Sequence, residues 1–323
     1  MKFLSLVIVL FAAFSLTGCN GLAFASPLLT VTATVTPVTP SATPTANPTA
    51  TRTIIPTPGI SPTATPTWVA QGPDEVKVPI LLYHHISVSP IGSRYYVPPD
   101  KFESEIKLLH DWGYSTITTS MLVNSILVGA SLPPRPILIT FDDANEDNYT
   151  NAFPIMKKYG FTGVLYLPYD YLGTNGYLTV DQVKEMASGG WEVGSHSMTH
   201  SINFPVMDPP IMRSEIVDSR KKLQALLGLP ILTFAYPFGD APNGAVDYVH
   251  FAGYIAAMGA TGFTADQGTS NLFVLQRCEI KGSDDAKSMT RFLPWLGDPS
   301  FLPTSTPTPT VTPTWTPKPT WTP

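Results

Sequence analysis

The sequence predicts an α/β fold built on a parallel sheet and carried between two segments rich in threonine and proline. Between residues 76 and 297, apolar runs typical of buried strands alternate about seven times with helical patterns, as in repeated strand–helix units. The chain has 34 prolines, which are concentrated in residues 27–73 and 299–323. The region between these segments is long enough to bury a core. With about seven units, an open doubly wound sheet and an incomplete barrel both fit the pattern.

The strands and helices of this region follow from its apolar periodicity. Strands are predicted over residues 78–84, 136–141, 162–167, 191–195, 231–236, 254–258 and 273–277. Helices are predicted over residues 101–112, 149–159, 180–187, 212–227, 245–252 and 286–293. The helix over 212–227 has the clearest end, because Gly228 and Pro230 follow it. In parallel α/β folds the chemistry gathers at the C-terminal ends of strands, so polar residues there are candidate site residues.

Charge argues against one class of binding partner, and cysteine content argues against a disulfide or a cysteine metal site. The net charge is -5 and no cluster of lysine or arginine is present, which argues against nucleic acid. No pattern indicates a protein partner. The two cysteines, Cys19 and Cys278, have no evident disulfide partner and form no CxxC metal pattern. We expect Cys278 to be a small buried apolar residue.

The N-terminus carries an export signal. A lysine at position 2 precedes an apolar run over residues 3–16, which is too short to cross a membrane. The following Leu-Thr-Gly-Cys resembles a bacterial lipobox, which predicts a signal peptide over 1–18 and a lipid on Cys19. Cleavage after Ala25, in an Ala-Phe-Ala pattern, is the alternative and would release a soluble protein. Both predict an extracytoplasmic protein, and the first anchors it to membrane lipid.

Thr, Pro, Ala and Ser dominate the segments that flank the predicted domain of residues 76–297. Such a composition cannot bury enough apolar surface to offset the entropy of ordering the chain. We therefore expect a linker over 19–75 and a disordered tail over 298–323, both extended by their prolines. The linker would hold the domain away from the membrane.

Two short motifs follow predicted strands and carry the candidate chemistry. Asp142 and Asp143 end one strand, where adjacent carboxylates are costly unless they are paired or bind a metal. His196 and His200 follow another strand, and their spacing places two imidazoles within reach of one cation. Taken alone, each motif also fits an ordinary turn or a chance pair. Together, Asp143, His196 and His200 form a two-histidine, one-carboxylate set that zinc, cobalt, nickel or iron could occupy.

Over residues 76–297 the chain resembles the polysaccharide deacetylases of carbohydrate esterase family 4. The Thr-Phe-Asp-Asp of residues 140–143 matches one family motif, and the His-Ser-Met-Thr-His of residues 196–200 matches another. The resemblance implies a distorted, incomplete (β/α)7 barrel that removes acetyl groups from a polysaccharide. It also implies that Asp142 is the general base and that Asp143, His196 and His200 bind a divalent metal, with zinc expected first.

The chain departs from this family at two places. Ala235, in Phe-Ala-Tyr-Pro-Phe-Gly, stands where the family has an arginine that orients the base, so another group must hold Asp142. The backbone N–H of Phe238 is a candidate oxyanion donor, and Tyr236 a candidate sugar contact, although a core turn also explains this segment. The family's late histidine has no counterpart, because no histidine follows His250.

The first predicted strand offers a substitute for the late histidine. Its Tyr-His-His resembles the branch of biofilm-type poly-N-acetylglucosamine deacetylases, which implies that His84 is the general acid. Because neighbouring strand residues point to opposite sides, we expect only one of His84 and His85 to face the cleft. Further tyrosines could form a sugar-stacking cleft, namely Tyr95, Tyr96, Tyr169 and Tyr171. His110 and His250 fall within helical patterns and are expected to be structural or exposed.

These residues together predict a metal-dependent hydrolase that removes N-acetyl groups from a cell-surface or extracellular polysaccharide of N-acetylglucosamine type. Two alternatives remain open on the sequence. One is an ester deacetylase on an acetylated, xylan-like polymer, which needs less help from an acid because an ester has the better leaving group. The other is a non-catalytic glycan-binding protein on a degenerate deacetylase fold.

Overall fold

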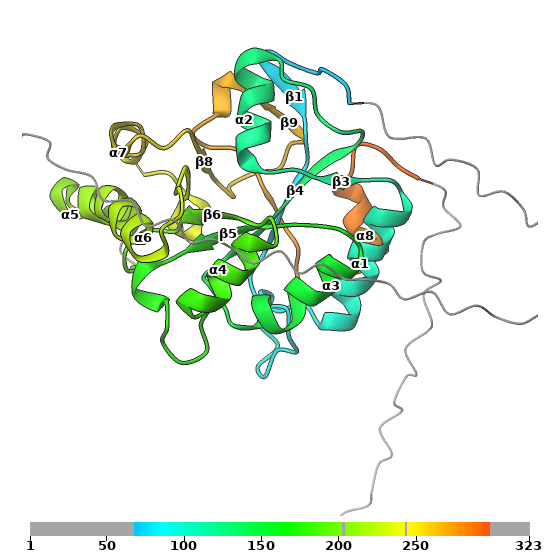
Figure 1. Cartoon of the computed structure of the whole chain (residues 1–323), viewed down its shortest axis with the longest axis horizontal. Coiled ribbons are helices and arrows are strands. Elements are labelled where there is room, and N and C mark those ends of the chain that lie inside the picture. The colour runs from blue at the N-terminus through cyan, green and yellow to red at the C-terminus, as the bar shows by residue number, and fades with distance from the viewer. Residues whose placement is uncertain (1–67, 202–203, 243, 298–323) are drawn as a thin grey trace, which may run out of the picture. The chain divides into compact units, whose positions relative to one another are not determined.

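A curled sheet of parallel strands organises the computed structural model of the chain (Figure 1). The strands lie in the order β10-β2-β4-β5-β6-β7-β8, and the short strand β3 pairs beside β4. The parallel strands are β2 (Ile80–Tyr83), β3 (Ser115–Thr116), β4 (Pro136–Asp142), β5 (Val164–Leu167), β6 (Glu192–Ser195), β7 (Thr233–Ala235), β8 (Ala256–Met258) and β10 (Cys278–Glu279). The expected fold, an incomplete barrel of parallel strands and helices, is confirmed.

The structure describes residues 68–201, 204–242 and 244–297. The predicted signal peptide, Cys19, the linker as far as residue 67 and the tail from residue 298 lie outside these residues. Backbone pairing with the domain starts before the boundary at 76 that composition indicates, because Val69 pairs with Leu132. Within the described part of the chain, no helix is both long and apolar enough to cross a membrane.

Alternate residues of each strand point to the two faces of the curled sheet. On β4, Ile137, Ile139 and Phe141 belong to the outer core, which the surrounding helices cover. Leu138 belongs to the inner core instead. Asp142 lies four residues further along β4 and therefore points into the curl as well. The strand alternation thus aims this carboxylate at the interior of the barrel.

Helices cover the outer face of the sheet (Figure 1). They are α1 (Pro99–Asp111), α3 (Phe153–Lys158), α4 (Val180–Ser188), α5 (Pro209–Arg213), α6 (Ser219–Leu227), α7 (Ala245–Ala252) and α8 (Ala286–Met289). Local signals set several ends: Pro99 lies in the first turn of α1, and Thr179 and Gln182 form a capping box on α4. Gly228 ends α6 in the left-handed conformation, as the sequence predicted.

One helix, α2 (Thr119–Val128), was not predicted from the sequence. Nearly all its side chains are apolar or small, so it shows no polar stripe that would reveal a helical period. Leu122, Val123 and Ile126 pack into the inner core. The helix lies beside the antiparallel pair of β1 (Glu75–Lys77) and β9 (Asp266–Gly268) (Figure 1). It fills the barrel at the end away from the strand termini that carry the predicted site.

Several predicted elements differ from the structure. The helix expected over 149–159 begins as a π-helical segment, η1 (Asn148–Ala152), and the helix expected over 286–293 ends as a 3₁₀ turn, η7 (Thr290–Phe292). The helix expected over 212–227 contains a π-helical segment, η4 (Ser214–Asp218), between α5 and α6. The strand expected over 273–277 is wrong, because only Leu275 of this segment forms a bridge, with Met258 of β8. The chain then pairs with β2 as β10. The segment between β8 and β10 therefore bridges the two edges of the parallel sheet.

Helix α1 carries a buried carboxyl group, that of Glu105, on the face that packs against the sheet. The side chain of Glu105 accepts a 2.9 Å hydrogen bond from the Tyr83 hydroxyl. Burial raises the pKa of Glu105 to about 8, although this hydrogen bond opposes the rise. The folded protein therefore holds this carboxyl protonated at neutral pH, whereas the unfolded chain ionises it near its ordinary pKa of 4.5.

We expect Glu105→Gln to stabilise the fold increasingly as pH rises. Between pH 4.5 and about 8 the folded wild type binds one more proton than the unfolded chain, so its stability falls across this window. The melting temperature of Glu105→Gln relative to wild type should increase by more than about 2 °C from about pH 5 to about pH 8.5. Glu103→Gln, on the exposed face of the same helix, is the control. A pH-independent difference for Glu105→Gln would contradict the buried, protonated carboxyl.

Candidate active site

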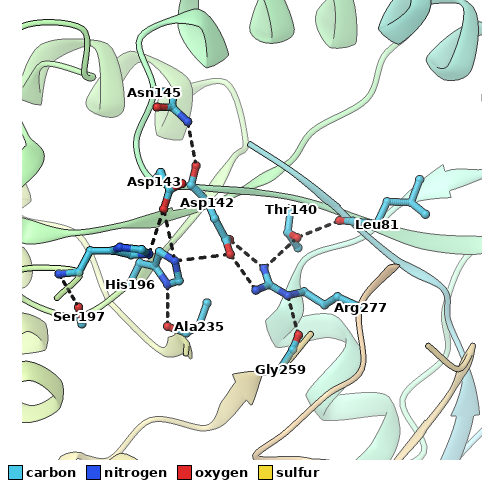
Figure 2. A network of polar contacts seen from close by, with 11 residues as sticks. Leu81, Thr140, Asp142, Asp143, Asn145, His196, Ser197, Ala235, Gly259 and Arg277 are labelled. Atoms are coloured by element: carbon cyan, nitrogen blue, oxygen red, sulfur yellow. Dashed lines mark hydrogen bonds and ion pairs between the residues drawn. The ribbon is translucent and has the colours of Figure 1, made fainter. Parts of the chain in front are cut away.

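The two sequence motifs meet at the C-terminal ends of β4 and β6 (Figure 2). Asp142 is the last residue of β4, and Asp143 follows it in the left-handed backbone conformation. His196 follows β6, and His200 lies four residues further on, also left-handed. β4 and β6 both pair with β5, which fixes their separation and brings the two motifs to one edge of the sheet.

Asp143, His196 and His200 offer ligand atoms that all lie within 4.8 Å of one another. The Oδ1 atom of Asp143 is 3.5 Å from Nε2 of His196 and 3.3 Å from Nε2 of His200. This buried carboxylate oxygen accepts no hydrogen bond from any residue that the structure describes. One carboxylate oxygen and two imidazole nitrogens converging in this way suit a divalent transition-metal ion.

One hydrogen bond sets the tautomer of His196, and burial sets its protonation state. Its Nδ1 lies 2.7 Å from the backbone oxygen of Ala235, so Nδ1 carries the proton and Nε2 is left as the free lone pair (Figure 2). Burial lowers the pKa of His196 to about 4, against the opposing effect of Asp142. The ring is therefore neutral at physiological pH, which is the form that binds metal.

Glu215, which was not among the predicted site residues, holds the loop between the two histidines. Its Oε2 accepts hydrogen bonds from the backbone N–H groups of Met198 (3.0 Å) and Thr199 (2.9 Å). Its Oε1 accepts a third bond, 2.7 Å, from the Thr199 hydroxyl. Glu215 lies in η4, and no local motif links that segment to the histidine loop. Three bonds from one buried carboxylate fix a loop whose Ser197 and His200 have positive φ.

Arg277 is the group that holds Asp142. Its Nη1 and Nη2 donate to Oδ1 and Oδ2 of Asp142, each at 2.8 Å, in a two-bond fork (Figure 2). The two side chains are 0% and 3% exposed, so water does not screen the pair. Burial alone would raise the pKa of Asp142, but Arg277 and then His196 outweigh it and lower the pKa to about 2. Asp142 is therefore ionised and fixed in orientation.

Further contacts fix the position of the Arg277 guanidinium. Its Nε donates to the backbone oxygen of Gly259 at 2.9 Å, and its Nη1 contacts the Thr140 hydroxyl at 3.3 Å (Figure 2). The guanidinium also lies over the Tyr166 ring, 5.6 Å from its centroid. Ala235 stands where the family's arginine is expected, and no local motif marks Arg277 as its substitute. The available signal was an arginine at the end of an apolar run, where a charge is costly unless paired.

Both histidines at the end of β2 line the cavity beside this site. The expectation that only one would do so is wrong, because β2 ends at Tyr83 and strand alternation no longer applies. His84 lies near Asp142 and contributes to the lowered pKa of that carboxyl group. The Nδ1 atom of His84 is buried and has no hydrogen-bond partner among the described residues. His85 differs, since its Nδ1 lies 2.8 Å from a carboxylate oxygen of Asp147. The region predicted to supply an acid therefore presents two imidazoles.

A cavity of about 260 Å³ opens over the metal-site residues. Tyr95, Tyr96 and Phe238 line it, and the Phe238 ring lies 4.9 Å from the His200 ring. Phe238 is 50% exposed and has a positive φ, so its backbone is held in an unusual turn. Tyr171 lies nearby, with its ring 6.1 Å from that of His200. Tyr95, Tyr96 and Phe238 give the cavity an aromatic rim suited to stacking on a sugar ring.

Tyr236 does not contribute to this rim. Its ring is fully buried in the outer core and packs edge-on against Phe234 at 5.3 Å. The prediction that its side chain contacts substrate is wrong, because the ring, which follows β7 directly, is enclosed in the outer core. Tyr169 also packs against the outer core. These two tyrosines serve packing.

Three further predictions concern residues outside the site. His110 and His250 are exposed on α1 and α7, as expected. Cys278 is a buried free thiol, also as expected, and burial raises its pKa. A thiol of this kind is a poor nucleophile.

Fold and site together define a hydrolase built on an incomplete parallel barrel, and comparisons with known proteins agree. Residues 129–257 match the sequence model of the polysaccharide deacetylase family. The Bacillus subtilis protein YxkH, named as a polysaccharide deacetylase, is 32% identical over 208 residues, covering 63% of this chain and 71% of that protein. The chain belongs to the polysaccharide deacetylase family, a family of hydrolases that act on amides.

Two further relatives show how far the likeness extends. A poly-beta-1,6-N-acetyl-D-glucosamine N-deacetylase of Staphylococcus aureus is 32% identical over 163 residues, which cover 45% of this chain and 54% of that enzyme. The structure of the Streptococcus pyogenes deacetylase PplD, in complex with acetate, superposes with a TM-score of 0.62 at 24% identity. It covers 71% of this chain and 99% of the PplD chain, which establishes the shared fold.

The buried pair of Asp142 and Arg277 predicts a non-additive response to mutation. Arg277→Met leaves an ionised carboxylate without its partner and should destabilise the metal-free protein by about 3–5 kcal/mol in denaturant unfolding. In an Asp142→Asn background the same change should cost much less, because the amide needs no cation. Lys158→Met, which breaks the exposed pair with Glu103, is the control and should change little. Additive effects of the two mutations would show that the pair is not energetically coupled.

Proposed function

We propose that this protein is a metal-dependent N-deacetylase that removes acetyl groups from an extracellular polysaccharide of N-acetylglucosamine type. The observation that carries the proposal is the metal-site geometry of Asp143, His196 and His200 beside a fixed, ionised Asp142. Relatedness to an enzyme named for poly-beta-1,6-N-acetyl-D-glucosamine supports the substrate class. The family membership supports the reaction type.

The site suits a divalent cation on the chemistry of its donors. Asp143 supplies a buried oxygen that lacks a partner among the described residues, and His196 and His200 supply imidazole nitrogens at ligand spacing. Zinc fits this mixed donor set, and cobalt, nickel or iron are further candidates. A bound cation supplies a Lewis acid that polarises the acetyl carbonyl.

The remaining chemistry belongs to residues of this chain. Asp142 takes the proton of the water that attacks the acetyl carbon, while Arg277 keeps the carboxylate oriented. The backbone N–H of Phe238 is our candidate donor to the developing oxyanion. His84 gives a proton to the departing amine, which leaves poorly without one. His84 is suited to this role because its ring lines the cavity and lies close to Asp142.

We further propose that the enzyme works outside the cytoplasm, held to the membrane by a lipid on Cys19. The support is the Leu-Thr-Gly-Cys sequence after an apolar N-terminal run. The linker rich in threonine and proline would then give the domain reach toward its polymer.

Acetate release from a panel of polymers tests the function. Chelated enzyme should be inactive, and added zinc should restore acetate release from N-acetylglucosamine oligomers and polymers. Release from acetylxylan alone would identify an ester deacetylase instead. Binding of glycans without release from any polymer, with metal present, would identify a non-catalytic binding protein.

The roles of the two aspartates predict different effects of mutation. Asp142→Asn should lower the rate by at least about 10²-fold while leaving metal content nearly unchanged, because this residue moves a proton. His196→Ala and Asp143→Ala should remove both metal and activity. Metal content per chain and acetate release decide between these patterns. Loss of metal in Asp142→Asn as complete as in His196→Ala would mean that the roles are wrongly assigned.

The proposed role of His84 as general acid can be tested with two substrates that differ in whether the leaving group needs a proton. His84→Ala should keep metal and fold but lower the rate on N-acetyl substrates by about 10²–10⁴-fold. An activated aryl acetate has a leaving group that needs no proton, so its hydrolysis should fall much less. His85→Ala is the matched control, since its ring is paired with Asp147. Equal losses on both substrates would assign His84 to positioning rather than proton transfer.

Anchoring is tested at the two cysteines. Cys19→Ala should abolish labelling by a fatty-acid analogue and shift the protein out of the membrane fraction. Cys278→Ala, which removes the buried thiol, should leave labelling unchanged. A wild-type protein that never takes up the label, with a mature N-terminus just after Ala25, would support a soluble secreted enzyme.

A further inference from the structure

One wall of the cavity carries a charged pair that the proposed reaction does not use. Glu279 and Arg94 both line the cavity, and Oε1 of Glu279 lies 3.4 Å from Nε of Arg94. Glu279 follows Arg277 by two residues, so both side chains point into the curl of the sheet. Arg277 is committed to Asp142, whereas Glu279 lies further along β10 and faces the cavity.

The carboxylate of Glu279 is mostly buried and has unused acceptor capacity. Its side chain is 19% exposed, against 56% for Arg94. The Oε1 atom is buried and accepts no hydrogen bond from any residue in the described ranges. A buried carboxylate oxygen without a donor is unfavourable, and an ion-pair contact of 3.4 Å does not replace a hydrogen bond. This oxygen therefore suits a donor from a bound molecule.

The backbone around Arg94 is fixed to the end of β10. The N–H of Gly282 donates to the backbone oxygen of Arg94 at 3.0 Å. A Cβ atom at position 282 would lie 2.1 Å from the backbone oxygen of Tyr96, so only glycine allows this approach. The Tyr95 hydroxyl accepts a 3.0 Å bond from Arg94, and the Tyr95 ring lies 4.7 Å from the His84 ring. The charged pair is thus held at a set position beside the predicted acid.

We propose that Glu279 and Arg94 bind two hydroxyl groups on neighbouring carbons of the sugar that bears the acetyl group. This inference rests on the proposed function. A carboxylate only accepts hydrogen bonds and a guanidinium only donates them, whereas a sugar hydroxyl can do both. Two adjacent hydroxyls therefore complement a carboxylate and guanidinium held side by side.

The pair would then distinguish glycan linkages. In a β-1,6-linked N-acetylglucosamine chain, the hydroxyls on carbons 3 and 4 are both free. In a β-1,4-linked chain, every sugar except the one at the non-reducing end has its carbon-4 oxygen in a glycosidic bond, where it cannot donate. A site that pairs with both hydroxyls leaves a buried polar group unsatisfied when one is missing, which lowers affinity. The charged pair would thus favour the β-1,6-linked polymer.

Kinetics on two oligomers of equal length, β-1,6- and β-1,4-linked, tests this inference. Glu279→Ala should lower kcat/KM on the β-1,6 oligomer by about 10- to 100-fold, mainly through KM, because a hydrogen bond to a charged group is lost. On the β-1,4 oligomer the loss should be less than about threefold. Glu279→Gln keeps an acceptor and should lose less than Glu279→Ala. Glu103→Gln, in the exposed pair with Lys158, is the control and should match wild type on both.

Equal losses on both oligomers, or no loss on either, would overturn the linkage role, provided that melting temperature and metal content match wild type. Calorimetric binding of the same oligomers provides a readout that does not depend on turnover. A wild type that binds the β-1,6 oligomer more tightly, with the preference lost in Glu279→Ala, supports the pair even if no acetate is released. In that case the proposed deacetylation fails while the recognition site stands. Equal binding of both oligomers by wild type would refute the recognition site.

Discussion

The buried ion pair between Asp142 and Arg277 constrains the rest of the site. An ionised carboxylate in the interior of a barrel is strongly unfavourable without a partner, and Arg277 supplies two charge-assisted hydrogen bonds. Arg277 lies between Leu275, which pairs beside β8, and β10, which pairs with β2. Satisfying the carboxylate therefore also requires the two edges of the sheet to come together. The position of Asp142 therefore depends on the segment that bridges the two edges of the sheet.

Backbone strain is concentrated around the same residues. Seven described residues other than glycine have positive φ, and five of them, Asp143, Ala144, Ser197, His200 and Phe238, lie at the site. Each such conformation is locally unfavourable and persists only where surrounding contacts enforce it. The bonds of Glu215 to the histidine loop are contacts of this kind. The strained turns aim the metal-site side chains at one another.

Three of the buried side-chain polar atoms that lack a hydrogen-bond partner among the described residues lie at the cavity. Oδ1 of Asp143, Nδ1 of His84 and Oε1 of Glu279 are all buried, and all three residues line it. Their chemistry differs: a carboxylate oxygen at the candidate cation site, an imidazole nitrogen beside Asp142, and a carboxylate oxygen next to a guanidinium. A single cavity thus brings together groups suited to a metal, to proton transfer and to hydroxyl recognition. This combination matches hydrolysis of an acetylated sugar better than any one group does.

Local patterns in the sequence determined the alternation of strands and helices. The Thr-Phe-Asp-Asp and His-Ser-Met-Thr-His motifs could also be recognised from the sequence, because the residues of each motif are neighbours in the chain. Tertiary structure alone decided which group holds Asp142, since Arg277 lies 135 residues away in the sequence. It also decided that α2 fills the barrel, because a helix that is apolar on most faces shows no period. The burial of Tyr236 and the shared exposure of His84 and His85 to the cavity depend on where short strands end. Each strand ends where its pairing with a strand distant in the sequence ends, and a local pattern of residues does not predict that pairing.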